Sequence, residues 1–314
     1  MTALIADAIY REHRTGSGHP EQVARFDAVM GAVEKLPGLV RIAPREAAED
    51  EIALVHTRRY METVARDVKA GRGELSTGDT VISARSMEVA LYAAGGVMNA
   101  VDAVVTGAAG NAFCVVRPPG HHARPDQGMG FCVYNSIAVG ARYAQRHHGL
   151  GKVMIVDWDV HHGNGTQDTF YEDGSVFFFS THQWPWYPGT GPASETGYGK
   201  GEGTTMNRPF AAGAGRAEIV GAFREDLRRA ADAFKPDLVM ISAGFDSRAG
   251  DPLGGFVLSD ADFAELTRVM LGIAGEHANG RVVSVLEGGY NLMGLASAAG
   301  AHVEALVEGS NASK

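Results

Sequence analysis

The chain has 314 residues, 45% of them hydrophobic, and a formal net charge of −9. The acidity argues against a general nucleic-acid-binding protein, and the hydrophobic content suits a folded domain with a substantial core. Cys114 and Cys132 are the two cysteines, which form neither a disulfide framework nor a CxxC metal site. Because we find no leader segment and no apolar run of membrane-spanning length, we expect a cytoplasmic protein that binds no membrane.

The first predicted elements lead to a pair of histidines. Residues 83–103 have apolar side chains at helical spacing, and the apolar run 112–116 is typical of a buried strand. The chain then continues as Arg117-Pro118-Pro119-Gly120-His121-His122. A Pro-Pro-Gly turn fixes the positions of the two imidazoles, which suits general acid–base chemistry. The alternative is a surface pair, which is how we interpret His147 and His148.

The next predicted strand leads to a candidate metal site. A helix over 135–145 precedes the apolar strand 152–156, and the chain leaves that strand as Asp157-Trp158-Asp159-Val160-His161-His162-Gly163-Asn164. Alternate residues of a strand share a face, so Asp157, Asp159 and His161 are expected to project together. Two carboxylates and an imidazole suit a borderline divalent metal ion. The alternative is an Asx-rich loop without a metal.

The remaining elements repeat this pattern of strand, polar loop and helix. A buried strand is predicted at 176–180, a pocket-shaping loop at 181–207, and helices at 216–233 and 259–276. The apolar strand that begins at Asp237 leads to Asp246. The apolar strand that begins at Arg281 leads to Glu287-Gly288-Gly289-Tyr290, where the glycine pair allows the tyrosine to turn inward.

The pattern predicts one α/β domain over residues 1–308, followed by a short polar tail at 309–314. We expect a doubly wound, mostly parallel sheet flanked by helices, because no linker or charge block interrupts the alternation. Four strands end in a residue suited to chemistry, and in such sheets ligands bind at the carboxyl ends of the strands. We therefore expect the active site at that edge.

Together these segments resemble a known superfamily. Further segments that carry the resemblance are Gly18-His19-Pro20-Glu21, Gly128-Met129-Gly130-Phe131-Cys132, Tyr187-Pro188-Gly189-Thr190-Gly191 and Gly250-Asp251-Pro252-Leu253. Almost end to end, the chain is similar to the arginase–deacetylase superfamily, and within it to class II histone deacetylases and bacterial relatives such as acetylpolyamine amidohydrolases. The resemblance implies the arginase/deacetylase fold and zinc-dependent hydrolysis of N-acetyl amides with release of acetate.

The resemblance also implies a role for each candidate residue. The ligands of a single Zn²⁺ are Asp159, His161 and Asp246. The proton-transfer pair is His121 and His122, with His122 favoured as the principal base, and their orienting partners are Asp157 and Asn164. The donor to the oxyanion is Tyr290. A structural K⁺ or Na⁺ is implied at Asp157 and Ser180.

A second set of residues matches the substrate tunnel. Gly130, Phe131 and Tyr187 resemble the walls that enclose an acyl-lysine chain, although many of these enzymes have Phe where this chain has Tyr187. Trp184 and Trp186 are expected at the rim, and Asp79 is matched to an acidic residue that holds the substrate backbone. Arg25 is matched to a channel for the acetate product, with an ordinary surface arginine as the alternative.

The substrate prediction depends on Leu253. Polyamine-specific enzymes tend to place a carboxylate at this position, so Leu253 favours acetyl-lysine in proteins or peptides. Three alternatives stay open: a deacetylase of acetylpolyamines or other small N-acyl amines, an arginase-like hydrolase with two manganese ions, and a non-catalytic acyl-lysine-binding protein. An oligomer is compatible with each of them.

Overall fold

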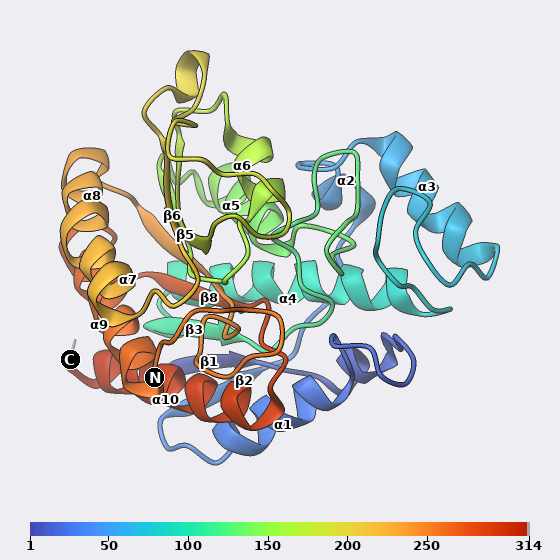
Figure 1. Ribbon diagram of the computed structural model, residues 1–314, viewed down its shortest axis with the longest axis horizontal. Helices are drawn as coiled ribbons and strands as arrows, with labels where there is room; N and C mark the ends of the chain where they lie inside the picture. The colour runs from blue at the N-terminus through green and yellow to red at the C-terminus, as the bar shows by residue number, and fades with distance from the viewer. Residues whose placement is uncertain (313–314) are drawn as a thin grey trace.

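A parallel β-sheet forms the centre of the protein (Figure 1). The computed structural model describes residues 1–312, and the sheet in it has eight strands in the order β2-β1-β3-β8-β7-β4-β5-β6. All seven pairings between neighbouring strands are parallel. The strands are β1 Thr2–Ile5, β2 Leu39–Ile42, β3 Asn111–Cys114, β4 Val153–Asp157, β5 Val176–Gln183, β6 Thr205–Phe210, β7 Leu238–Ala243 and β8 Val282–Leu286. The predicted α/β class is confirmed.

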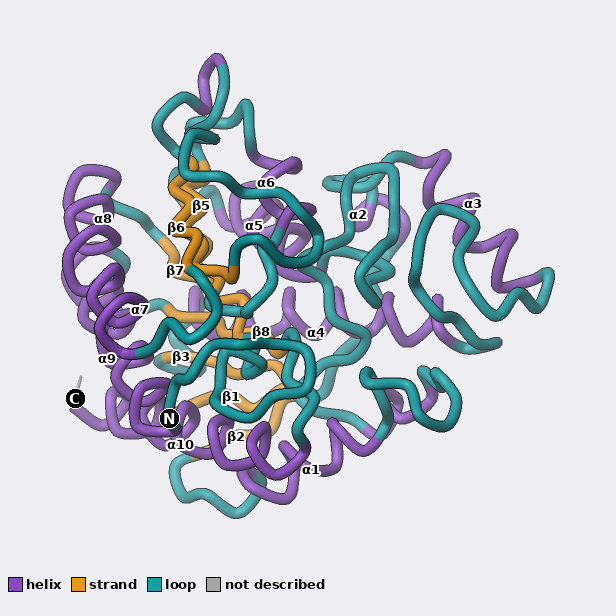
Figure 2. The backbone as a smooth tube through the Cα atoms, viewed as in Figure 1, coloured by secondary structure: helices purple, strands orange, loops and turns teal. Residues whose placement is uncertain are grey.

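Helices cover both faces of this sheet (Figure 2). Helices α4 and α5 pack on one face, whereas α9 and α10 pack on the other, where α1 lies against α10. The α-helices are α1 Ala24–Val33, α2 Glu49–Ile52, α3 Arg58–Lys69, α4 Ser86–Val105, α5 Ser136–His148, α6 Asn164–Phe170, α7 Arg216–Ala222, α8 Arg228–Phe234, α9 Asp260–His277 and α10 Leu292–Ala312. Shorter turns are the 3₁₀ segments η1 Ala8–Glu12 and η2 Gly199–Gly201, and the π segment η3 Phe223–Leu227. The predicted helix 216–233 is thus present as α7, η3 and α8 in succession.

The inner strands are apolar because both of their faces are covered. Every residue of β3, β4, β7 and β8 is buried, as expected for strands of a parallel sheet between two helical layers. These four strands are also neighbours, in the order β3-β8-β7-β4. Their carboxyl ends therefore lie side by side at one edge of the sheet. The polar segments that follow these four strands begin at that edge.

The predicted loop 181–207 needs correction at both ends. Strand β5 continues to Gln183 and strand β6 begins at Thr205, so the connecting segment is shorter than expected. Strand β6 lies at the edge of the sheet and has the mixed sequence Thr-Met-Asn-Arg-Pro-Phe, which lacks an apolar run. Proline is tolerated in edge strands, where one side of the backbone needs no partner.

Two further expectations differ from the structure. Residues 309–312, expected to be part of a polar tail, continue helix α10, while 313–314 lie outside the described residues. Helix α4 has the length and apolarity of a membrane span, contrary to the prediction that no apolar run approaches that length. However, 67% of its most apolar window is buried inside the protein, as in the core helix of a folded domain.

Candidate active site

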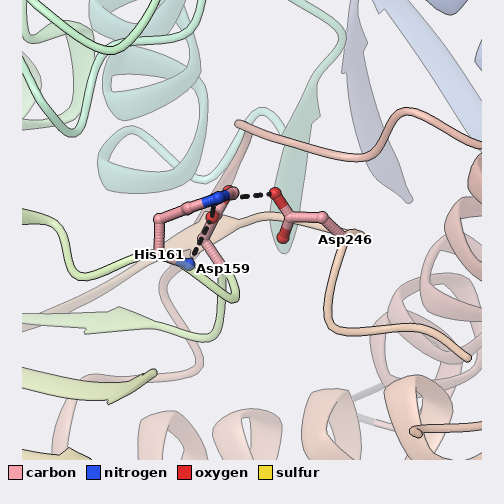
Figure 3. Close-up of side chains that lie close together, drawn as sticks. All are labelled: Asp159, His161 and Asp246. Atoms are coloured by element: carbon pink, nitrogen blue, oxygen red, sulfur yellow. Dashed lines mark hydrogen bonds and ion pairs between the residues drawn. The ribbon is translucent and has the colours of Figure 1, made fainter. Parts of the chain in front are cut away.

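Three side chains from two neighbouring strand ends converge in a buried cluster (Figure 3). Asp159 and His161 follow β4, and Asp246 follows β7. His161 Nδ1 lies 3.0 Å from Asp159 Oδ1 and 3.3 Å from Asp246 Oδ2. One donor atom of each residue lies within 4.8 Å of the other two. The structure therefore brings the three predicted metal ligands together.

The backbone holds this cluster in place. The main-chain N–H of Val160 donates to Asp246 Oδ1 at 2.8 Å, and that of Gly288 donates to Asp159 Oδ2 at 2.8 Å. A Cβ atom at Gly288 would collide with the carboxylates of both Asp159 and Asp246. Glycine is therefore required at this position, because the backbone approaches the carboxylates directly.

The donor set fits a divalent cation. Asp159 and Asp246 are fully buried, and Asp246 Oδ2 accepts no hydrogen bond. Burial, reinforced by the negative charge of Asp159, raises the pKa of Asp246 to about 7. Against the effect of its own burial, the nearby carboxylates of Asp159 and Asp246 raise the pKa of His161 to about 10. Buried carboxylates with an unsatisfied oxygen need a compensating positive charge, and three protein ligands leave positions open for water and substrate.

The two adjacent histidines lie beside this cluster, and each has a partner on its Nδ1 atom. His121 Nδ1 lies 2.9 Å from Asp157 Oδ2, and His122 Nδ1 lies 2.8 Å from Asn164 Oδ1. The two imidazole rings are 4.0 Å apart between centroids. An amide oxygen accepts, so His122 carries its proton on Nδ1 and presents a lone pair at Nε2.

The environments of the two histidines shift their pKa values in opposite directions. Burial opposes charge on His121, but the carboxylates of Asp157 and Asp159 raise its pKa well above the usual range. Burial lowers the pKa of His122 well below that range, and the charges of His121 and His161 lower it further. The surroundings therefore favour the protonated form of His121 and the neutral form of His122, which suits one acid and one base.

The sequence did not lead us to expect a role for Glu287 in this site. Its Oε2 atom accepts hydrogen bonds from the main-chain N–H groups of Gly120 and His121, at 2.7 and 3.1 Å. Its Oε1 atom accepts a hydrogen bond from Ser242 Oγ at 3.1 Å. Burial raises the pKa of Glu287 to about 7. The sequence did contain a signal for this role. Glu287 is an acidic residue directly after the apolar strand β8, at the same sheet edge as the histidines.

A cavity of ≈230 Å³ opens from the histidines toward the surface. Its lining residues are Asp79, His122, Gly130, Phe131, His161, Trp186, Tyr187, Leu253 and Tyr290. The cavity is thus lined by every residue that the resemblance assigns to substrate binding. These are Asp79, Gly130, Phe131, Tyr187 and Leu253, and Tyr290, the predicted oxyanion donor, lies beside them. Trp184 does not line the cavity, so of the two rim tryptophans only Trp186 is placed there.

Aromatic rings form much of the cavity lining. The ring of Tyr290 lies 5.9 Å from that of Phe131, and the ring of Tyr187 lies perpendicular to His122 at 5.3 Å. Phe131 has a φ of 67°, and the preceding residue, Gly130, donates its N–H to Asp79 Oδ1 at 2.7 Å. Asp79 thus supports the segment that carries Phe131.

Tyr290 is held from both sides. Its main-chain N–H donates to Asp251 Oδ2 at 2.7 Å, and the Arg25 guanidinium lies 5.1 Å from the centre of its ring. Arg25 is fully buried and pairs with Glu21 at 3.0 Å, so the interpretation as a surface arginine is wrong. A role for Arg25 in a product channel stays a prediction.

Two other sequence-based interpretations can be compared with the structure. Asp157 and Ser180 are register partners in β4 and β5, but Ser180 Oγ lies 2.9 Å from His182 Nδ1, and a monovalent cation there stays a prediction. The pair His147 and His148 lies at the surface end of α5, where His148 Nε2 contacts Asp102. Cys132 is buried.

Comparisons with family models and with known proteins find deacetylases, and a comparison with solved structures finds a similar fold. The model of the histone deacetylase domain matches residues 19–306. "Histone deacetylase 10, chloroplastic" from Oryza sativa subsp. japonica is 43% identical over 298 residues, which is 89% of this chain and 67% of that protein. "Polyamine deacetylase HDAC10" from Homo sapiens is 39% identical over 329 residues, 98% of this chain and 48% of that protein. The solved structure titled "Crystal Structure of HDA15 HD domain" has a TM-score of 0.92 and 36% identity, covering 98% of this chain and 90% of that one.

Proposed function

This chain belongs to the histone deacetylase domain family and is an amidohydrolase, and we propose that it removes acetyl groups from lysine side chains of proteins or peptides. The observation that carries the proposal is the position of the buried Asp159–His161–Asp246 cluster and the neutral His122 at the inner end of an aromatic-lined cavity. A narrow apolar cavity of this kind encloses an extended methylene chain and leads its acyl end to the polar groups inside.

We assign a single Zn²⁺ to Asp159, His161 and Asp246, in keeping with the deacetylase family. When bound, the ion supplies Lewis acidity toward an amide carbonyl and a water molecule. Among the described residues, the other group of three metal-type donors, Asp232, Glu276 and His277, lies on or near the surface, away from this cavity. That arrangement supports a single-metal deacetylase over an arginase-like enzyme with two manganese ions.

The proton steps follow from the two histidines. His122 accepts a proton at Nε2 from the attacking water, because its Nδ1 is occupied by Asn164. His121, which Asp157 keeps protonated, stabilises negative charge during the reaction. The leaving amine takes up a proton from this histidine pair before it departs.

Tyr290 stabilises the charge that develops on the carbonyl oxygen. Burial raises the pKa of Tyr290 well above its usual range, so the phenol keeps its proton and donates a hydrogen bond. Such a donor, positioned before the reaction, stabilises the transition state more than the ground state. Phe131 and Tyr187 hold the methylene chain on either side of this path.

Acetylpolyamines form the second candidate substrate class. One human relative carries the name polyamine deacetylase, and Asp79 places a carboxylate on the cavity lining. Leu253, which also lines the cavity, brings no charge to pair with a second cationic nitrogen. This residue favours acetyl-lysine over acetylpolyamines.

A panel of substrates tests the proposal. Zinc-loaded protein is assayed for acetate release from acetyl-lysine peptides, acetylputrescine, acetylspermidine and longer acyl-lysine peptides, and the kcat/KM values are compared. The proposal predicts the highest kcat/KM for acetyl-lysine peptides. Preference for acetylspermidine would favour the second candidate, and binding of acetyl-lysine without acetate release would favour a non-catalytic binding protein.

A further inference from the structure

The cavity wall that carries Tyr187 lies on an exposed loop. Residues 184–191, which we call the wall loop, connect β5 to the segment leading to β6. Tyr187 is 38% exposed and Trp186 is 45% exposed, yet both line the cavity. Because little core packing restrains such a loop, its position depends on a few specific contacts.

His162 makes one of these contacts. It follows the metal-ligand candidate His161 and is almost fully buried. His162 Nδ1 lies 2.8 Å from Thr190 Oγ1, and His162 Nε2 lies 3.0 Å from Gln167 Oε1. One imidazole therefore joins the metal-ligand segment to the wall loop.

The surrounding hydrogen bonds show which atoms of His162 donate and which accept. Gln167 Oε1 also accepts from Asn207 Nδ2 at 2.7 Å, while Gln167 Nε2 donates to Glu195 Oε2 at 2.6 Å. Since Gln167 Oε1 is an acceptor, His162 Nε2 carries a proton and donates to it. A neutral His162 then presents a lone pair at Nδ1, and the Thr190 hydroxyl donates to that lone pair.

The next residue of the loop packs on the same imidazole. A Cβ atom at Gly191 would lie 2.6 Å from the ring of His162 and 2.7 Å from His182 Nε2. The carbonyl oxygen of Gly191 accepts a hydrogen bond from His182 Nε2 at 2.8 Å. Gly191 has a φ of 85°, so the loop needs glycine here for both its conformation and its close approach.

We propose that His162 and Thr190 are positioning residues that fix the wall loop, and with it Tyr187, over the catalytic histidines. At the other side of Tyr187, Trp186 Nε1 donates to the carbonyl oxygen of Leu253 at 2.8 Å. The Tyr187 ring lies 5.3 Å from His122 and 6.1 Å from His161. We expect loss of the hydrogen bond between Thr190 and His162 to loosen the wall loop and to leave the metal ligands in place. The proposal deepens the function proposed above and rests on it for its kinetic consequence.

The matched pair Thr190→Val and Thr190→Ser tests this proposal. Valine keeps the shape of threonine without the hydroxyl, and serine keeps the hydroxyl. We expect Thr190→Val to raise KM for an acetyl-lysine peptide by about three- to tenfold, the size of one lost neutral hydrogen bond, with kcat within about twofold. Thr190→Ser is expected to restore a KM near that of the wild type.

Tryptophan fluorescence gives a readout that does not depend on activity. Of the three tryptophans, Trp158 is fully buried, whereas Trp184 and Trp186 are 36% and 45% exposed and both lie in the wall loop. Quenching by acrylamide therefore reports on the wall loop. We expect stronger quenching in Thr190→Val than in the wild type and in Thr190→Ser, at equal zinc content and similar melting temperature.

Each outcome is informative. Equal quenching and equal KM in the two variants would overturn the positioning role, as would equal losses in both, which indicate packing alone. A looser wall loop in Thr190→Val, in a protein whose wild type releases no acetate, would support the positioning role and contradict the proposed function. If Thr190→Val does not fold, Thr190→Ala is compared with Thr190→Ser in the same way.

Discussion

At the inner end of the cavity lie side chains that follow buried strands of the sheet, whereas the cavity wall includes an exposed loop between β5 and β6. We call Asp159, His161, Asp246 and His122 the floor; His161 and His122 line the cavity, and the two carboxylates contact His161. In the floor, buried main-chain N–H groups hold these two carboxylates. In the wall loop, residues 184–191, a few side-chain hydrogen bonds hold the chain: those of Trp186 and Thr190, and the one from His182 to the Gly191 carbonyl. Rigid sheet edges thus position the chemistry, and a locally restrained loop positions the substrate.

This contrast leads to a general expectation for substitutions. Changes in the floor remove interactions that are made in the transition state, so they lower kcat. Changes at the wall alter binding of substrate and transition state alike, so they act mainly on KM or on the choice of substrate.

Removal of a metal ligand is expected to have the largest effect. Asp246→Ala eliminates a buried carboxylate of the proposed zinc site, and its rate of acetate release should fall by roughly a thousandfold or more, because a catalytic metal contributes several kcal/mol. Zinc content and acetate release are measured on the same preparation. Turnover at the wild-type rate by Asp246→Ala would show that the metal assignment is wrong.

Removal of the oxyanion donor should come next. Tyr290→Phe keeps the ring that contacts Phe131 and loses only the phenol, so kcat should fall by roughly a hundred- to a thousandfold with little change in KM. The zinc content is expected to stay at the wild-type level, which distinguishes this variant from Asp246→Ala. A rise in KM with unchanged kcat would place Tyr290 in the wall instead.

Glu287 tests whether the backbone support of the floor matters for catalysis. Glu287→Gln weakens the acceptor for the N–H groups of Gly120 and His121, so kcat should fall roughly tenfold, since hydrogen bonds to a charged group contribute about 1.5–3 kcal/mol. Ser242→Ala is the matched control, because it removes only the contact to the other carboxylate oxygen. Equal kinetics of Glu287→Gln and Ser242→Ala would contradict the positioning of the histidines by Glu287.

The smallest effect is expected at the rim. Leu253→Glu adds a carboxylate to the cavity lining, which should shift the ratio of kcat/KM values by about two- to fivefold toward acetylspermidine, the scale of an exposed ion pair. Leu253→Gln has a similar shape without the charge and should leave the ratio unchanged. A similar shift in both variants would mean that polarity or size, and not charge, sets the preference.

Much of the floor could be predicted from the sequence. Apolar runs mark β3, β4, β7 and β8, and each is followed by a chemically apt residue such as His121, Asp159, Asp246 or Tyr290. Parallel strands bring the residues that follow them to one edge of the sheet. That the site residues converge there therefore follows from local patterns and a general rule of topology. That these four strands are neighbours depends on the strand order, which the patterns do not contain.

The wall could be predicted only in part. Tyr187 was matched to the tunnel through its family motif, but its support by His162 and Thr190 joins residues far apart in the sequence. The support that Glu287 gives to the histidine segment could not be predicted, because there its partners are main-chain N–H groups, which leave no trace in residue types. Strand β6 was missed because an edge strand with Pro209 lacks an apolar run.

An anomalous difference map at the zinc absorption edge, from crystals of the zinc-loaded protein, tests the central claim most directly. We predict one strong peak within coordination distance of Asp159, His161 and Asp246, at the inner end of the cavity lined by His122 and Tyr290. A map with no peak there, or with two neighbouring metal peaks, would contradict the single-metal site on which the proposed hydrolysis depends.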